Sequence, residues 1–240
     1  MSIADNINKV REQIAGAAAR IGRKSDEITL VAVSKQKPIE MIEAAYMAGV
    51  RHFGENRSSE LAEKAHALAH LDGIHWHFIG QLQTRQSLPV AKHSHAFHAV
   101  DRLKIARRLS RQLVELNRTL PVYIEVNVSG EASKSGFDCG VWEQDNEQRK
   151  RLVAAMLEIA ALPQLEVQGL MTMAPFTATE TVIRPIFQRT HQLAEWLRTS
   201  TPTLALPHIS MGMTNDFEIA IEEGATHVRV GRAIFGARAY

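Results

Sequence analysis

Lys35 is the side chain whose position in the sequence most directly indicates covalent chemistry. It follows the apolar run from Ile28 to Val33, which is typical of a strand buried on both faces. Pro38 comes shortly after and suits the first turn of a helix. An ammonium group at the carboxyl end of a buried strand loses hydration, which favours the neutral amine that attacks aldehydes. The position therefore predicts a Schiff-base lysine, and the alternative is a strand-end lysine that extends outward to water.

Two loops late in the sequence could bind an anion. The segment from Ser210 to Asn215 ends an apolar strand and offers Thr214 or Asn215 as a helix N-cap. Gly231 ends the next strand and precedes a second short helix. Backbone N–H groups at helix starts bind phosphate, and the loops after the seventh and eighth strands of α/β barrels frequently form such sites. Ordinary turn and capping chemistry would use the same residues.

Arg229 lies inside the apolar segment from His227 to Val230, so its guanidinium must be paired or face the interior of a barrel. The guanidinium is a permanent donor, and beside a reactive lysine it would bind an acceptor such as an unprotonated pyridine nitrogen. A lysine for the aldehyde, an anion site and a partner for the ring nitrogen are the parts of a pyridoxal phosphate site. The alternative for Arg229 is a salt bridge to a carboxylate on a neighbouring strand.

Eight apolar segments alternate with helical patterns and would position these residues. We expect strands at residues 28–33, 51–56, 75–80, 96–101, 121–129, 165–173, 208–212 and 227–231. Alternating strands and helices predict a parallel sheet, and eight such units close into a single (β/α)8 TIM barrel, here one domain over residues 1–240. A doubly wound open sheet would usually carry a G-x-G-x-x-G turn, which the sequence lacks.

The helices that should cover the barrel carry apolar residues at helical spacing. We expect Gly49 to end the first of them and Pro185 to delay or kink the one over about residues 179–199. An additional amphipathic helix over about residues 3–22 should pack on the body of the protein. We expect one helix that follows the second strand and ends at about residue 70. The other helices are expected over about residues 39–48, 102–117, 142–161 and 215–223.

Composition restricts the classes of function. The 240 residues carry 28 Lys and Arg against 26 Asp and Glu, a net charge of +2, which argues against a nucleic-acid binder held by phosphate neutralisation. Cys139 is the single cysteine and cannot form an internal disulfide, so we expect a cytoplasmic location. No apolar run approaches the roughly 18 residues of a membrane span, and charged residues interrupt the region where a signal peptide would be apolar.

Several other side chains compete for the same roles. Lys37 follows the first strand and should be solvated, whereas Lys134 lies in the polar loop 130–140 and could touch a ligand or close the site. Only Lys35 directly ends a buried strand. A group of histidines invites a metal interpretation, but no carboxylate or cysteine completes a recognised spacing, so we expect no metal. These histidines are His75, His77, His93, His95 and His98.

Seven motifs occur in order over nearly the whole chain. They are Val31–Pro38, Phe53–Asn56, His75–Gln83, Ser133–Gly136, Gly169–Met173, Ser210–Thr214 and Val228–Gly236. Each is weak alone, but the ordered set is specific. The chain resembles the pyridoxal phosphate homeostasis proteins, whose fold is similar to the N-terminal barrel domain of alanine racemase.

The resemblance implies roles for particular residues. Lys35 would carry pyridoxal 5′-phosphate (PLP) as an internal aldimine, and Arg229 would meet the pyridine nitrogen. Asn56 would lie near the ring face or its 3′-oxygen. The phosphate would be held by Ser210, Thr214 and the backbone around Gly212, Gly231 and Arg232.

The chain departs from the family pattern in three places. The family commonly has Leu-Gln-x-Asn-Lys where this chain has Leu-Gln-Thr-Arg-Gln, so no role is carried onto Arg85 or Gln86. Thr214 stands where a serine is frequent, and the hydroxyl is kept. Arg232 stands where a small hydroxyl residue is common, and it either adds a charge near the phosphate or points away.

The resemblance implies a carrier that holds PLP reversibly and takes part in intracellular vitamin B6 homeostasis, with effects on amino-acid and keto-acid pools. We expect a monomer that serves PLP-dependent apoenzymes and binds neither nucleic acid nor membranes. An arginine at the ring nitrogen weakens the cofactor as an electron sink, which disfavours independent turnover.

Two enzymes remain as alternatives. A low-efficiency PLP-dependent amino-acid racemase needs bases on both faces of a carbanion, and Lys35 could serve one face. The tyrosines are poorly placed for the other face, since Tyr46 lies in a helix, Tyr123 is at the wrong end of its strand and Tyr240 is the last residue. A Schiff-base aldolase-type barrel acting on sugar phosphates is the third hypothesis.

Overall fold

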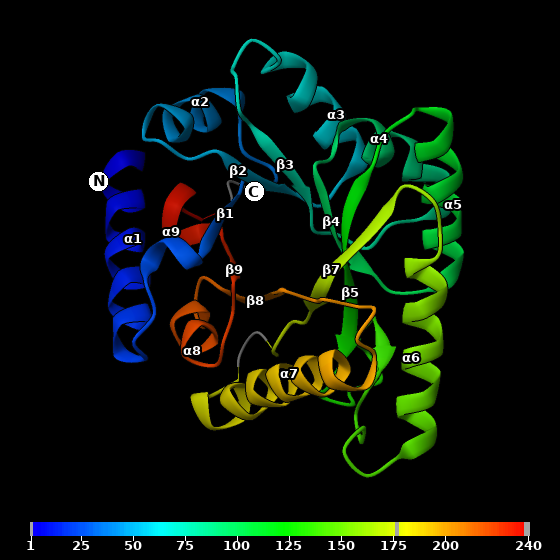
Figure 1. Ribbon diagram of the computed structural model, residues 1–240. Helices are drawn as coiled ribbons and strands as arrows, with labels where there is room; N and C mark the ends of the chain where they lie inside the picture. The colour runs from blue at the N-terminus through cyan, green and yellow to red at the C-terminus, as the bar shows by residue number, and fades with distance from the viewer. Residues whose placement is uncertain (1, 176–177, 238–240) are drawn as a thin grey trace.

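Eight parallel strands close into a barrel in the computed structural model, which describes residues 2–175 and 178–237 (Figure 1). β1 pairs with both β2 and β9, and β4 pairs with β5, so the sheet closes on itself. The predicted (β/α)8 barrel is confirmed. Its strands are β1 (Thr29–Val33), β2 (His52–Glu55), β3 (His75–Phe78), β4 (Ala96–Val100), β5 (Leu120–Asn127), β7 (Leu165–Met171), β8 (His208–Met213) and β9 (His227–Val230).

Helices surround the strands on the outside of the barrel (Figure 1). They are α1 (Ile3–Arg20), α2 (Ile39–Met47), α3 (Ser58–Ala67), α4 (Ser87–His93), α5 (Leu103–Glu115), α6 (Asn146–Ala160), α7 (Glu180–Ser200), α8 (Phe217–Glu222) and α9 (Arg232–Phe235). The additional amino-terminal helix α1 packs against α2, α8 and α9 through the buried side chains of Ile7, Val10 and Ile14, as its periodicity predicts. In the described part of the chain, every helix is too short or too polar to cross a membrane.

The segment that carries Lys35 folds largely as its sequence predicts. The last three residues of β1 are buried, and Val31 pairs with Arg229 of β9. Pro38 stands at the N-cap of α2, one position before the predicted first turn. Gly49 ends this helix with a φ of +83°, in the left-handed region that favours glycine.

Two short elements were not predicted, and one helix begins later than expected. α4 and the two-residue strand β6 (Phe137–Asp138), which pairs with β5, are too short to give a periodic signal. α8 begins at Phe217 with Asp216 at its N-cap position, so the prediction of Thr214 or Asn215 as the cap is wrong. The reason is local, since the Asp216 carboxylate accepts the Met213 N–H and thereby forms the turn before the helix.

Pro185 does not delay α7, which begins five residues earlier at Glu180. A proline lacks one backbone donor, and near a helix start this removes a single intrahelical hydrogen bond. The buried face of α7 includes Ile183, Ile186 and Phe187, so packing on both sides of the proline holds this first part of the helix. The expectation of a delayed start was therefore wrong.

Polar rings fill part of the barrel interior, where branched aliphatic layers are usual. His98 stacks on Tyr123 with ring centroids 4.2 Å apart and meets His77 at 5.0 Å. His227 belongs to the same group of rings, and its centroid lies 5.4 Å from that of Tyr123. Among the described residues, no group of three or more His, Cys, Asp and Glu side chains is arranged to hold a metal ion.

Candidate functional site

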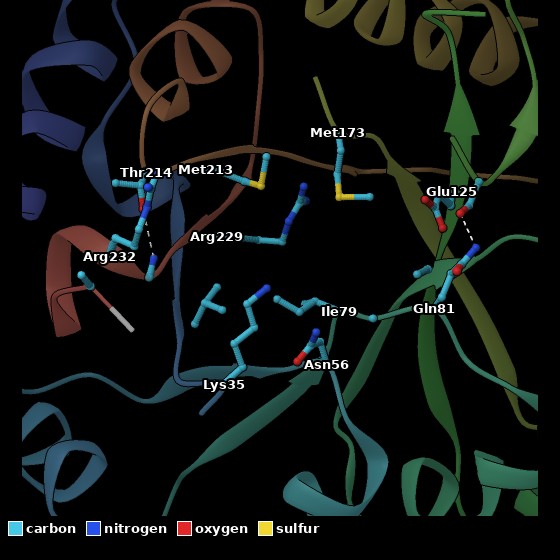
Figure 2. Close-up of a pocket in the computed structure, with 16 residues that line it drawn as sticks. Lys35, Asn56, Ile79, Gln81, Glu125, Met173, Met213, Thr214, Arg229 and Arg232 are labelled. Carbon is cyan, nitrogen blue, oxygen red and sulfur yellow. Dashed lines mark hydrogen bonds between the residues drawn. The ribbon is translucent and has the colours of Figure 1, made fainter. Parts of the chain in front are cut away.

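A cavity of about 830 Å³ lies at the carboxyl ends of the barrel strands. This is the end at which TIM-barrel proteins place their ligands. Most of the sequence-predicted site residues share its lining, namely Lys35, Asn56, Thr214, Arg229, Gly231 and Arg232. Figure 2 shows the Lys35 side chain pointing into this cavity, with Asn56 beside it and Arg229 across from it.

A buried ion-pair network holds the end of β1 next to Lys35. The Nζ of Lys64, on α3, donates to the backbone carbonyl of Ser34 at 2.7 Å and to Glu55 Oε1 at 2.8 Å. The Ser34 hydroxyl donates to the same carboxylate oxygen at 2.6 Å. Burial raises the pKa of Glu55, and the Lys64 ammonium opposes that shift. Since the network fixes the residue before Lys35, it fixes the direction in which the Lys35 side chain leaves the strand.

Thr214 and Arg232 lie together on one side of the cavity (Figure 2), and Gly231 also belongs to its lining. The Gly231 N–H donates to the Thr214 hydroxyl at 3.3 Å, which joins the loop after β8 to the start of α9. Arg232 is an exposed residue of the cavity lining, and its Nη2 donates to Asn215 Oδ1 at 3.4 Å. Whether its charge serves a bound phosphate stays a prediction. Backbone N–H groups, a hydroxyl and a guanidinium at a helix start suit an anion such as phosphate.

Ser210 and Gly212 are not among the lining residues in the described part of the structure. The Ser210 side chain is fully buried inside the barrel, where its hydroxyl contacts Arg229 and His98. Gly212 has a φ of +90°, and a Cβ there would lie 2.5 Å from the Cβ of Ala220. Glycine at this position therefore allows the close packing of β8 against α8.

Arg229 is buried, yet its side chain lines the cavity. Nη1 donates to the Ser210 hydroxyl at 2.5 Å and Nη2 donates to the Thr172 carbonyl at 2.9 Å. Both partners are neutral oxygens, so these contacts are not the carboxylate salt bridge of the alternative prediction. Burial lowers the pKa of Arg229 to about 10, against the opposing charges of Asp216 and Glu125. The guanidinium therefore stays charged and keeps further N–H groups for a ligand.

Glu125 of β5 is a lining residue that sequence reasoning missed. Its side chain is 3% exposed, and burial raises the pKa of the carboxyl to about 7, with a further contribution from Asp101. Its Oε2 is buried with no hydrogen-bond partner among the described residues. The signal was present in the sequence, because Tyr123, Glu125 and Asn127 share one face of a strand by period-two alternation. Ile79 and Gln81, which follow β3, were missed as well.

The competing lysines and tyrosines have other partners. Lys37, expected to be solvated, is half-buried, and its Nζ donates to the Phe235, Gly236 and Ala237 carbonyls at 3.0, 3.2 and 2.7 Å. These carbonyls lie at and just beyond the C-terminal end of α9, where a cation is favourable. Lys134 donates to the Met173 carbonyl at 3.0 Å and so lies at the cavity rim.

Two of the three tyrosines can be placed. The Tyr46 hydroxyl donates to the Asp72 carbonyl at 2.9 Å, and the Tyr123 hydroxyl lies 3.1 Å from His227 Nε2 in the barrel interior. Neither side chain lines the cavity. The prediction for Tyr240 lies outside the described residues.

Comparison with known proteins places the chain in a family. The alanine racemase N-terminal domain family matches residues 2–239. The pyridoxal phosphate homeostasis protein of Pseudomonas aeruginosa is 43% identical over 239 residues, which cover 100% of this chain and 97% of that protein. The protein of the same name from Aquifex aeolicus is 38% identical over 240 residues and is covered completely, as is this chain.

The chain belongs to the pyridoxal phosphate homeostasis protein family.

Solved structures of similar proteins agree with the barrel described above. PipY of Synechococcus elongatus without PLP superimposes with a TM-score of 0.85 at 33% identity, over 98% of this chain and 100% of PipY. The structure of PipY with PLP bound gives a TM-score of 0.84 at 32% identity with the same coverage. Alanine racemase of Clostridium difficile matches at 13% identity with a TM-score of 0.73, over 98% of this chain and 56% of that enzyme, and so shares the fold alone.

Proposed function

We propose that this chain binds PLP through a Schiff base to Lys35 and takes part in intracellular vitamin B6 homeostasis, with effects on amino-acid and keto-acid pools. One observation carries the proposal: Lys35 and Arg229 line the same cavity as the hydrogen-bonded pair Thr214 and Gly231. Membership of the homeostasis protein family supports it, as does the PLP-bound structure of PipY.

The residues present fit the three parts of PLP. The Lys35 amine would add to the aldehyde carbon and release water, leaving a C=N bond. Arg229 would donate to an unprotonated ring nitrogen, because a guanidinium has no lone pair to accept a proton. The Thr214 hydroxyl, the Gly231 N–H and the Arg232 charge suit the phosphate. Asn56 lies beside Lys35 and would contact the ring or its 3′-oxygen (Figure 2).

Borohydride reduction tests the proposal. The protein would be incubated with PLP, reduced and mapped by peptide mass spectrometry, and we expect the adduct on Lys35 alone. Lys35→Ala should abolish the adduct, whereas Lys37→Ala should retain it, since Lys37 contacts carbonyls after α9 instead. An adduct on another lysine in the unmodified chain, or no adduct at all, would contradict the proposal.

A low-efficiency racemase is the second candidate, and the position of Glu125 favours it. A buried carboxyl with a pKa of about 7 on the lining of the same cavity could exchange protons near neutral pH. Exchange of the α-hydrogen of an amino acid with deuterated solvent should then require both Lys35 and Glu125. Exchange that persists in Glu125→Gln would remove this candidate.

We also propose that the chain is a single-domain, cytoplasmic monomer that supplies PLP to dependent apoenzymes. The family match over residues 2–239 supports one domain, and a buried free thiol at Cys139 supports a reducing compartment. Sedimentation of the purified protein at several concentrations tests the monomer. A concentration-dependent shift in mass would contradict it.

A further inference from the structure

Three histidines on neighbouring strands form a hydrogen-bonded chain through the barrel interior. His52 Nδ1 lies 2.9 Å from His77 Nε2, and His77 Nδ1 lies 2.8 Å from His98 Nε2. The chain continues from His98 Nδ1 to the Ser210 hydroxyl at 2.8 Å, and the same hydroxyl accepts from Arg229 at 2.5 Å. It therefore runs from the first residue of β2, at the amino end of the barrel, to a side chain on the cavity lining.

Burial favours the neutral form of all three imidazoles, because it lowers the pKa of each ring. Burial lowers the pKa of His77 and of His98 well below the ordinary value, and the neighbouring histidines lower both further, as does Arg229 for His98. Burial and the neighbouring His75 lower the pKa of His52 as well. A neutral imidazole has one N–H donor and one acceptor nitrogen, so each ring can occupy one of two tautomers.

Arg229 fixes which tautomer each ring adopts. Its guanidinium can only donate, so the Ser210 oxygen accepts that bond. Ser210 is fully buried, and among the described residues His98 Nδ1 is the other hydrogen-bond partner of its hydroxyl, so the Ser210 hydrogen is paired only when it points to Nδ1. His98 must then carry its hydrogen on Nε2 and donate to His77 Nδ1. By the same reasoning His77 donates from Nε2 to His52 Nδ1, which leaves the His52 hydrogen on Nε2 as well. All the bonds point one way, from Arg229 toward the amino end of the barrel.

We propose that His98, supported by His77 and His52, is a positioning residue that holds Ser210 as the acceptor for Arg229 and so aims the remaining guanidinium N–H groups into the cavity. Where the target of those groups is the ring nitrogen of PLP, the inference rests on the proposed function. The tautomers themselves do not depend on any ligand.

The geometry favours positioning over simple packing of the barrel. Apolar side chains would fill the interior equally well, but they would leave the Ser210 hydrogen free to rotate and the Arg229 contact without a fixed direction. His208 provides the comparison within the same group of rings. It lies 5.0 Å from His227 and 6.4 Å from Tyr123 between centroids, yet its Nδ1 has no hydrogen-bond partner among the described residues.

Nuclear magnetic resonance of isotope-labelled histidine in the cofactor-free protein tests the chain directly. We expect His52, His77 and His98 to be neutral at pH 7, each with its hydrogen on Nε2. Ser210→Ala removes the link to Arg229 while keeping a small side chain, and we expect the His98 ring to lose its single tautomer. A charged ring, or an Nδ1–H tautomer at any of the three positions in the unmodified protein, would overturn the proposal.

Three variants test the positioning role through the rate of PLP release. His98→Leu removes the acceptor of the Ser210 hydrogen, and we expect PLP to be released about tenfold faster. This factor corresponds to the loss of about one hydrogen bond to a charged group. His98→Asn retains an acceptor near the position of Nδ1 and should stay within about twofold of the unmodified protein. His208→Asn, the matched control, should leave the rate unchanged.

The outcomes separate this inference from the proposed function. Equal rates in His98→Leu and His208→Asn would overturn positioning, as would failure of His98→Asn to restore the rate. If the unmodified protein takes up no PLP, the proposed function fails, and the tautomers measured without cofactor still decide whether the chain exists. If His98→Leu does not fold, Ser210→Ala supplies the same test of the link to Arg229.

Discussion

The Nζ of Lys64 lies 2.8 Å from Glu55 Oε1, and both side chains are buried, at 6% and 0% exposure. This pair joins α3 to the end of β2, and through the Ser34 carbonyl it also reaches the residue before Lys35. A buried charge left without its partner is costly, whereas a pair at the surface contributes little.

Lys64→Met should lower the free energy of unfolding by about 3–5 kcal/mol, because the Glu55 carboxylate would remain buried without its cation. Urea denaturation measures the loss. Lys150→Met is the control, since the Lys150–Glu147 pair has the same 2.8 Å separation but is two-thirds exposed, and it should cost at most about 1 kcal/mol. Adding Glu55→Gln to Lys64→Met should recover part of the stability. Equal losses in the two lysine variants would contradict this reading.

Glu125 should make stability fall as the pH rises. Burial raises its pKa in the folded protein from 4.5 to about 7, so its contribution is fully present below about pH 4.5 and is lost as the pH rises through 7. Glu125→Gln removes this titration, and the variant should gain about 3 kcal/mol relative to the unmodified protein between pH 4.5 and 8. Urea denaturation across this range checks the difference. A flat difference for Glu125→Gln would refute the prediction.

Gly212→Ala should destabilise the fold by about 2–4 kcal/mol. The residue has a φ of +90°, and an added Cβ would lie 2.5 Å from Ala220 Cβ and 2.9 Å from Phe217 Cα, so strain and overpacking add together. Gly22→Ala separates the two effects, because Gly22 has a φ of +72° but no atom within 4 Å of the added Cβ. It should cost only about 1 kcal/mol in a thermal or urea melt. Similar costs at both positions would show that packing against α8 is unimportant.

Thr214→Val should weaken PLP binding about tenfold, because it removes the hydroxyl that accepts from Gly231 and would contact the phosphate. Thr214→Ser keeps the hydroxyl and should bind within about threefold of the unmodified protein. Fluorescence titration with PLP measures both affinities. If Thr214→Val binds PLP as tightly as Thr214→Ser does, the phosphate does not contact the Thr214 hydroxyl.

The alternating pattern of apolar strands predicted the barrel because each strand is buried on both faces and gives a continuous apolar run. The same pattern placed Lys35 and Thr214 at the cavity, since each stands at or just beyond the end of its strand. Ser210 was harder to place. β8 continues to Met213, so Ser210 lies three residues before the strand end, and alternation gives the face of a residue but not its depth in the barrel.

Long-range polar partners could not be predicted. Lys64 occupies the apolar side of its helix between Leu61 and Leu68, which indicates burial but does not identify Glu55 as its partner. The histidine chain joins β2, β3 and β4 to β8, and a sequence gives no register between strands that far apart. The histidine spacing matched no recognised metal motif, and the pattern gave no indication of the hydrogen-bonded chain.

The seam between β1 and β9 brings Lys35, near the start of the sequence, next to Arg229 and Gly231 near its end. A nascent chain whose β9 is still inside the ribosome therefore exposes the Lys35 amine, but it lacks the Arg229 guanidinium and the loop at Gly231. On the proposed function, PLP capture must wait until β9 docks. A yellow, PLP-loaded molecule would then report that the barrel has closed.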